Sequence, residues 1–269
     1  MQLFSQAYPQ SYSPSSDSSI PVLIIPGLFG STTNWRSFAK QLGEYCPVIV
    51  IDQRNHGRSP HADSHSYSDM VGDLLEFIDN LGLAEINLCG HSMGGKVAMA
   101  FALMHPERVN RLAVLDIAPV EYSHTHAPYL EKMIELDLDL LQSRNAADQL
   151  LKHAISDTST RLFLLQSLAG TQGKFHWRLN LPVLLRDMPK ILSFPFSQLA
   201  GLSNTGETLF LSGEKSDYLL DSHHDQIVKF FPAAHFKAIP KAGHWLHAEQ
   251  PQTVLDSLLN FLQVGKNND

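Results

Sequence analysis

The chain alternates short apolar segments with stretches of helical periodicity, and this alternation restricts the possible folds more than any other feature of the sequence. The apolar segments are bounded by Gly, Pro or Asp and cover residues 21–25, 47–51, 86–89, 111–115, 208–211 and 235–239. Most are apolar at odd and even positions alike, as in strands buried on both faces of a parallel sheet. Helical patterns lie between them, at 67–81, 94–105 and 253–262. We therefore expect an α/β fold with a mostly parallel central sheet flanked by helices.

The alternation stops between residues 119 and 203, where helical patterns follow one another without a strand of the earlier kind. Helices are expected at 129–141, 146–155, 161–169 and 180–190. Helices inserted over a sheet edge commonly cover a ligand crevice at the C-terminal ends of the strands. The sequence thus predicts a core of residues 1–118 and 204–269, of which 1–19 are partly flexible, and a helical cap inserted at 119–203.

The motif Gly90-His91-Ser92-Met93-Gly94 lies between an expected strand and an expected helix. In this context G-x-S-x-G is the nucleophile elbow, a tight turn that holds a serine hydroxyl clear of the sheet. Glycines flank the serine because side chains at those positions would collide with the turn. The following helix presents its N-terminal amides to a reacting carbonyl group. Ser92 is therefore the predicted nucleophile of an acyl-transfer reaction.

A Pro-Gly loop, residues 26–30, directly follows the first apolar segment. A serine nucleophile needs two amide donors for the oxyanion of its tetrahedral intermediate. One is expected from Met93 and the other from Leu28, with Phe29 as the alternative donor. Three residues are expected to line the substrate pocket: Phe29, His91 and Trp245.

The general base must follow the serine in the chain, and His244 directly follows the last expected strand. It therefore lies on a loop at the C-terminal end of a strand, where a triad histidine belongs. Two carboxylates are candidates for the acid that orients it. Asp116 ends the segment 111–115 in an apolar context, where an unpaired charge is costly and a histidine partner offsets the cost. Asp217, in the loop after 208–211, is the alternative acid; Asp116 is favoured.

These motifs resemble those of the α/β-hydrolase superfamily over nearly the whole chain. Within it the chain is similar to the YbfF-type esterases, bacterial carboxylesterases with mitochondrial relatives. The similar pieces include Gly27-Leu28-Phe29-Gly30-Ser31, Arg54-Asn55-His56-Gly57, Gly90-His91-Ser92-Met93-Gly94-Gly95-Lys96, Asp116-Ile117-Ala118-Pro119-Val120 and Gly243-His244-Trp245-Leu246-His247. The resemblance implies hydrolysis of short- to medium-chain acyl esters or thioesters. It also supports Asp116, and it implies that the loop 52–59 is structural. The chain departs from many relatives by having Pro26 where they carry a histidine.

Composition and charge exclude several other classes of protein. A hydrophobic share of 43% rules out a disordered chain, and a net charge of −7 without a basic cluster argues against a nucleic-acid partner. The apolar runs are far shorter than the ~18–20 residues of a membrane span. Two cysteines cannot form a disulfide framework, and the N-terminus shows no signal peptide. We expect a cytoplasmic protein with no membrane insertion.

The sequence thus predicts a serine carboxylesterase that works through an acyl-enzyme intermediate. A carbon–carbon bond hydrolase or lyase of the same fold and a ligand receptor on a hydrolase scaffold are the alternatives. Dehalogenases and epoxide hydrolases carry a carboxylate in the elbow, so Ser92 argues against them. No metal-ligand or dinucleotide motif is present, and no metal or cofactor is expected. The expected partner is a small acyl ester or thioester, and both a monomer and a dimer are compatible with the sequence.

Overall fold

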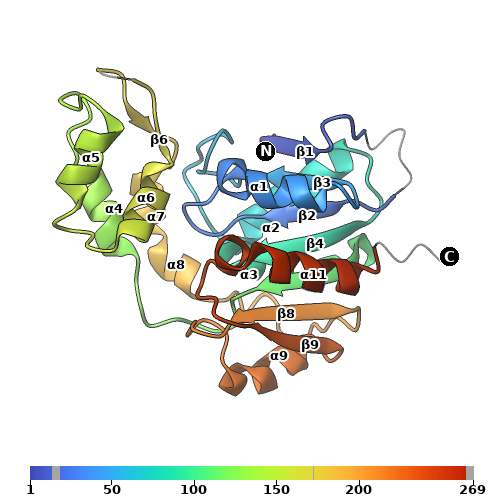
Figure 1. Cartoon of the computed structure of the whole chain (residues 1–269). Helices are drawn as coiled ribbons and strands as arrows, with labels where there is room; N and C mark the ends of the chain where they lie inside the picture. The colour runs from blue at the N-terminus through green and yellow to red at the C-terminus, as the bar shows by residue number, and fades with distance from the viewer. Residues whose placement is uncertain (14–18, 172, 265–269) are drawn as a thin grey trace.

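A computed structural model describes residues 1–13, 19–171 and 173–264, and its centre is a seven-stranded sheet (Figure 1). The strand order is β1-β3-β2-β4-β5-β8-β9, with β1 antiparallel to β3 and all other neighbours parallel. The strands are β1 (Ser5–Tyr8), β2 (Val22–Ile25), β3 (Val48–Ile51), β4 (Ile86–His91), β5 (Val109–Leu115), β8 (Thr208–Gly213) and β9 (Ala234–Ile239). The predicted α/β fold with a mostly parallel sheet is confirmed.

Helices cover both faces of this sheet. The helices α1 (Thr32–Leu42) and α11 (Pro251–Leu262) pack on one face, and α2 (Tyr67–Asn80), α3 (Met93–Met104) and α9 (His224–Phe230) pack on the other. Successive side chains of a strand point to opposite faces of the sheet. Leu23 therefore belongs to the hydrophobic cluster on one face and Ile24 to the cluster on the other. Helix α3 is buried along nearly its whole length, as its Ala- and Met-rich sequence predicts.

Several elements differ from the sequence-based expectation. Strand β1 was not predicted from the sequence. Its mixture of polar and apolar residues is typical of an edge strand, which has a neighbouring strand on one side only. The other edge strand, β9, is half exposed, whereas an apolar buried strand was expected there. Helices α1, α9 and the short α10 (Leu246–Glu249) were not predicted. Residues 1–19 were expected to be partly flexible. Residues 5–8 of this range form β1, and residues 14–18 lie outside the described residues.

The helical insertion predicted between β5 and β8 consists of short helices, and we call residues 119–203 the cap segment. Its elements are α4 (Ala127–Ile134), α5 (Arg144–Leu151), α6 (Thr158–Leu165), β6 (Leu168–Ala169), β7 (His176–Trp177), α7 (Leu181–Arg186) and α8 (Met188–Leu192). Figure 1 shows α4 to α7 as a lobe to one side of the sheet, while α8 leads back toward it. The helices are shorter than predicted, and 180–190 is divided into α7 and α8, with Pro189 in the first turn of α8. The predicted domain boundaries themselves stay a prediction.

Among residues 1–13, 19–171 and 173–264, no helix has the length and apolar character needed to cross a bilayer.

Candidate active site

Ser92 lies in the tight turn between β4 and α3. Its backbone has φ 53° and ψ −125°, a conformation that L-residues rarely adopt. A Cβ atom at Gly90 would lie 2.3 Å from the Gly94 carbonyl oxygen, and one at Gly94 would lie 2.3 Å from that of Ile25. The Ser92 amide donates to the Leu115 carbonyl at 3.0 Å, which ties the turn to β5. The two glycines therefore permit the strained turn that the sequence motif predicted.

His244 lies between Ser92 and Asp116. Its Nε2 atom is 3.0 Å from Ser92 Oγ, and its Nδ1 atom is 2.8 Å from Asp116 Oδ2. The three side chains come from the ends of β4 and β5 and from the loop after β9. This is the connectivity of a nucleophile, a general base and an orienting acid.

Asp116 is fully buried and its carboxylate is well supplied with donors. Its Oδ1 atom accepts from the Gly213 amide at 2.9 Å, and its Oδ2 atom accepts from the Ser216 hydroxyl as well as facing His244. Burial raises the pKa of Asp116 to about 6, although both hydrogen bonds oppose the rise. Burial lowers the pKa of His244, because the imidazolium would lose hydration. At neutral pH the pair is thus a carboxylate beside a neutral imidazole, the state that a general base requires.

Asp217, the alternative acid, follows Ser216 in the chain but takes no part in the contact between Asp116 and His244. Its side chain is exposed, whereas its neighbour Ser216 points at Asp116. Of the two carboxylates that the sequence left open, the fold brings Asp116 to His244. Ser216 is a site residue whose partner could not be read from the sequence, because only the parallel pairing of β5 with β8 makes the two loops neighbours.

The loop 26–30 lies against the elbow. A Cβ atom at Gly27 would be 3.0 Å from Ser92 Cβ. Phe29 has a positive φ of 67°, and its amide donates to His56 Nε2 at 3.1 Å. In the part of the chain that the structure describes, neither the Leu28 amide nor the Met93 amide donates a hydrogen bond. The amides of Leu28 and Met93 are therefore available to an oxyanion, whereas that of Phe29, the alternative donor, is already used.

The loop 52–59 supports the loop 26–30 from behind. Asp52 accepts from the amides of Thr32 at 2.6 Å and Arg58 at 2.8 Å, while the Gln53 side chain donates to the Pro26 carbonyl at 3.0 Å. None of these contacts reaches Ser92. They agree with the structural role that the family resemblance implied.

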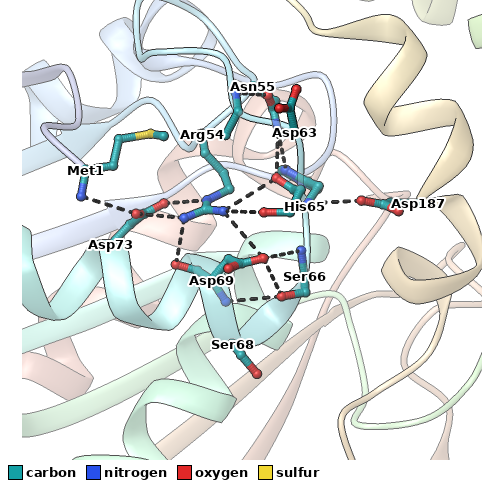
Figure 2. A network of polar contacts seen from close by, with 12 residues as sticks. Met1, Arg54, Asn55, Asp63, His65, Ser66, Ser68, Asp69, Asp73 and Asp187 are labelled. Carbon is teal, nitrogen blue, oxygen red and sulfur yellow. Dashed lines mark hydrogen bonds and ion pairs between the residues drawn. The ribbon is translucent and has the colours of Figure 1, made fainter.

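A polar network continues from this loop to α2 and to the cap segment (Figure 2). Arg54 donates to both carboxylate oxygens of Asp73 on α2, at 2.6 and 2.9 Å. The His65 amide donates to Asp187, between α7 and α8, at 3.0 Å. Core and cap segment thus share buried hydrogen bonds close to the site.

A largely apolar pocket with a free volume of about 60 Å³ opens beside Ser92. The three residues predicted for the pocket, Phe29, His91 and Trp245, all line it. Trp35 and the α6 residues Phe163 and Leu164 complete its apolar wall and were not predicted. A second space of about 20 Å³ lies on another side of Ser92 and is lined by Lys96, Tyr122, His124, His126 and Tyr218, among others. Both spaces take residues from the core and from the cap segment.

Lys96, four residues after Ser92 on α3, fastens both ends of the cap segment. Its ammonium donates to the carbonyl oxygens of Val120 at 2.8 Å, Leu192 at 2.8 Å and Ser193 at 2.7 Å. Burial lowers the pKa of Lys96 to about 7. A lysine within an apolar helix could have indicated such a role, but its backbone partners lie 24, 96 and 97 residues away along the chain.

The site holds no candidate metal centre: within the described ranges, no group of three or more His, Cys, Asp or Glu side chains is arranged to bind a metal ion. The chemistry available to these residues is acyl transfer through a serine nucleophile.

Comparison with known proteins identifies the family of the chain. The model of the α/β-hydrolase fold family matches residues 20–251. The sn-1-specific diacylglycerol lipase ABHD11 of Mus musculus is 40% identical over 256 residues, which cover 91% of this chain and 82% of that protein. Esterase YbfF of Escherichia coli is 31% identical over 243 residues, covering 90% and 92% of the two chains.

A solved structure gives the same result. A marine microorganism esterase superposes with a TM-score of 0.89 at 38% identity, covering 97% of this chain and 99% of that one. Relatives named as esterases and lipases confirm the predicted enzyme class and the similarity to YbfF. The chain therefore belongs to the α/β-hydrolase family and is a serine hydrolase of carboxylic esters.

Proposed function

We propose that this enzyme hydrolyses short-chain acyl esters, with Ser92 as nucleophile, His244 as general base and Asp116 as the acid that orients it. The observation that carries the proposal is the chain of contacts from Ser92 through His244 to Asp116, at 3.0 and 2.8 Å. The free amides of Leu28 and Met93 support their assignment as oxyanion donors. The pocket residues Phe29, His91 and Trp245 are proposed to contact the substrate.

In the proposed reaction, Ser92 Oγ attacks the ester carbonyl while His244 Nε2 takes the serine proton. Asp116 keeps the other proton of His244 on Nδ1 and stabilises the imidazolium. The oxyanion is held by the amides of Leu28 and Met93 until the tetrahedral intermediate collapses. The alcohol leaves with the proton from His244. A water molecule then repeats the sequence on the acyl-enzyme and releases the acid.

The size of the pocket supports a short acyl group. Its free volume of about 60 Å³ accommodates only a few heavy atoms. Medium chains need displacement of Phe163, which lines the pocket from the cap segment. Thioesters share the acyl part of the substrate and are proposed as alternative substrates. The cytoplasmic location stays a prediction from the sequence.

The test compares the protein with Ser92→Ala on p-nitrophenyl esters from acetate to decanoate and on the matching acyl-CoA thioesters. We expect kcat to fall by ~10⁴–10⁶ in the variant, the scale of triad removal, and a fluorophosphonate probe to label only the protein with Ser92. Ester activity above a tenth of the original would contradict the assignment of the nucleophile. Turnover of a vinylogous diketone without ester cleavage would instead favour a carbon–carbon bond hydrolase.

A further inference from the structure

The loop after β8 contributes an aromatic ring to the site. The ring of Tyr218 stacks on the imidazole of His244 with a centroid distance of 3.8 Å and an angle of 20° between the planes. Asp116 and Ser92 contact His244 at its two ring nitrogens, so these contacts lie at the ring edge. Tyr218 instead covers a face of the ring. The imidazole turns about its Cβ–Cγ bond, and a ring packed on its face opposes a turn that would carry the two nitrogens away from Ser92 and Asp116.

Tyr218 is held in place independently of His244. Its amide donates to Ser216 Oγ at 3.3 Å, and its carbonyl oxygen accepts from the Tyr122 hydroxyl at 2.5 Å. Its own hydroxyl lies 3.2 Å from Nε2 of His126 in the cap segment. Three hydrogen bonds therefore hold the backbone and side chain of Tyr218, so the position of its ring does not depend on the contact with His244.

The location favours an electrostatic role as well as a steric one. The His244 side chain is 20% exposed, and Asp116, its charged neighbour, is fully buried. During acylation His244 becomes a cation, and a cation over the face of a tyrosine ring is attracted by the negative potential of that face. The attraction is absent while the imidazole is neutral. It therefore stabilises the transition state more than the ground state, which is the requirement for a gain in kcat.

We propose that Tyr218 is a positioning residue of the reaction: its ring fixes the plane of His244 and stabilises the imidazolium that forms when Ser92 attacks. This inference rests on the proposed roles of Ser92 and His244. It assigns a function to the loop that the sequence had marked only as the place of an alternative acid.

The first experiment compares Tyr218→Phe, which keeps the ring, with Tyr218→Leu, which removes it. Because desolvated cation–π contacts contribute up to about 2 kcal/mol, we expect Tyr218→Leu to lower kcat by roughly 10–30-fold. KM should change much less, and Tyr218→Phe should retain most of the activity. The rate of fluorophosphonate labelling should fall in parallel with kcat, since it needs the same base. Tyr129→Leu is the matched control, because Tyr129 stacks on His126 rather than on His244.

A second series separates the ring's charge distribution from its shape and does not depend on the folding of the leucine variant. Phenylalanine at position 218 is replaced by analogues with one, two and three fluorine atoms, which weaken the negative potential of the ring face in steps. We expect kcat to decrease with each fluorine and the acid limb of the kcat/KM profile to move to lower pH, because the imidazolium is stabilised less. Asp116, His91, His124 and His126 surround His244 in every variant, so their contributions are constant across the series.

Equal kcat values across the fluorinated series together with an active leucine variant would overturn the proposal. An inactive Ser92→Ala protein with unchanged Tyr218 variants would refute only the role of Tyr218. An active Ser92→Ala protein would refute the proposed function itself.

Discussion

The catalytic edge of the core and the cap segment are built in different ways. At the edge, the site residues directly follow paired strands: His91 pairs with Leu115 and Leu115 with Leu211, and Ser92 and Asp116 come next in the chain. The amides of Ser92 and Asp116 continue this ladder by donating to Leu115 and Leu211. The register of the sheet therefore sets the distances between the reacting groups.

The cap segment is fastened by individual contacts instead. Lys96 ties its two ends to α3, and the His65 amide reaches Asp187. Among the described cap residues, His126 and the α6 residues Thr160, Phe163 and Leu164 line the pocket. Substitutions at the edge should therefore abolish the chemistry, whereas substitutions in the cap segment should change which substrate is accepted.

The largest effect is expected at the edge, from Asp116→Asn. Loss of the carboxylate leaves His244 without the partner that selects its tautomer, so kcat should fall by ~10⁴. Asp217→Asn is the matched control one loop away, and its kcat should stay within about threefold of the original. Steady-state kinetics on p-nitrophenyl acetate measures both. A larger loss in Asp217→Asn would place the acid in the loop after β8.

Acid should destabilise the core through its buried histidines. His56, His65, His91 and His247 are buried in the core, and burial lowers their pKa values, to about 4 for His56 and about 3 for His91. Below about pH 6.5 the unfolded chain takes up protons that the folded protein does not, so stability is lost as the pH falls. Each such histidine contributes up to about 1.4 kcal/mol per pH unit, a slope reached about one unit below pH 6.5.

The test of this pH dependence is urea unfolding at several pH values between about 7.5 and 5.5. His247→Phe keeps the stack on Trp35, whose ring centroid is 3.9 Å away. It should reduce the slope, by up to about 1.4 kcal/mol per pH unit at the acid end of this range. His153→Gln, at an exposed position of the cap segment, is the control and should leave the slope unchanged. An unchanged slope in His247→Phe would show that His247 is not buried neutral.

An intermediate effect is expected where core and cap segment join. Lys96→Met removes the donor of three carbonyl groups, and an unsatisfied buried acceptor costs about 1–3 kcal/mol. Methionine carries no charge, so the variant avoids the cost of burying the ammonium, and this offsets part of the loss. We expect KM to rise roughly tenfold while kcat changes far less. In the control Lys190→Met, the buried carboxylate of Asp187 loses the ammonium of an exposed lysine but keeps Arg186 and the His65 amide, and KM should not change. A fall in kcat alone would mean that Lys96 acts on the nucleophile turn.

The smallest effect is expected inside the cap segment, from Phe163→Ala. The phenyl ring lines the pocket and lies 5.5 Å from the Trp245 ring, so its removal lengthens the space for an acyl chain. The ratio of kcat/KM for the hexanoate ester to kcat/KM for the acetate ester should rise by roughly 3–10-fold. This corresponds to the free energy of burying one or two methylene groups. Leu162→Ala is the control, because Leu162 is 53% exposed on the same helix. An equal rise in the control would contradict a role for Phe163 in chain length.

Some elements could have been found in the sequence and were missed. Helix α1 begins with Ser31 as N-cap and a capping box to Asn34, and its buried residues Trp35, Phe38 and Leu42 follow a helical spacing. By contrast, the helix expected at 129–141 ends at Ile134, although the leucines after it continue the periodic pattern. Leu141 is fully buried outside any helix. Periodicity indicates which residues are buried, but not whether a short segment stays helical.

Local sequence patterns predict the alternation of strands and helices, the elbow around Ser92 and the location of His244 after the last strand. These features depend on neighbours in the chain, such as the glycines at 90 and 94 that the turn requires. The tertiary structure, by contrast, places Asp116 beside His244, leaves the Leu28 amide free while that of Phe29 is used, and stacks Tyr218 on His244. These outcomes depend on which strands pair and on hydrogen bonds between loops far apart in the chain, and no local pattern encodes such partners.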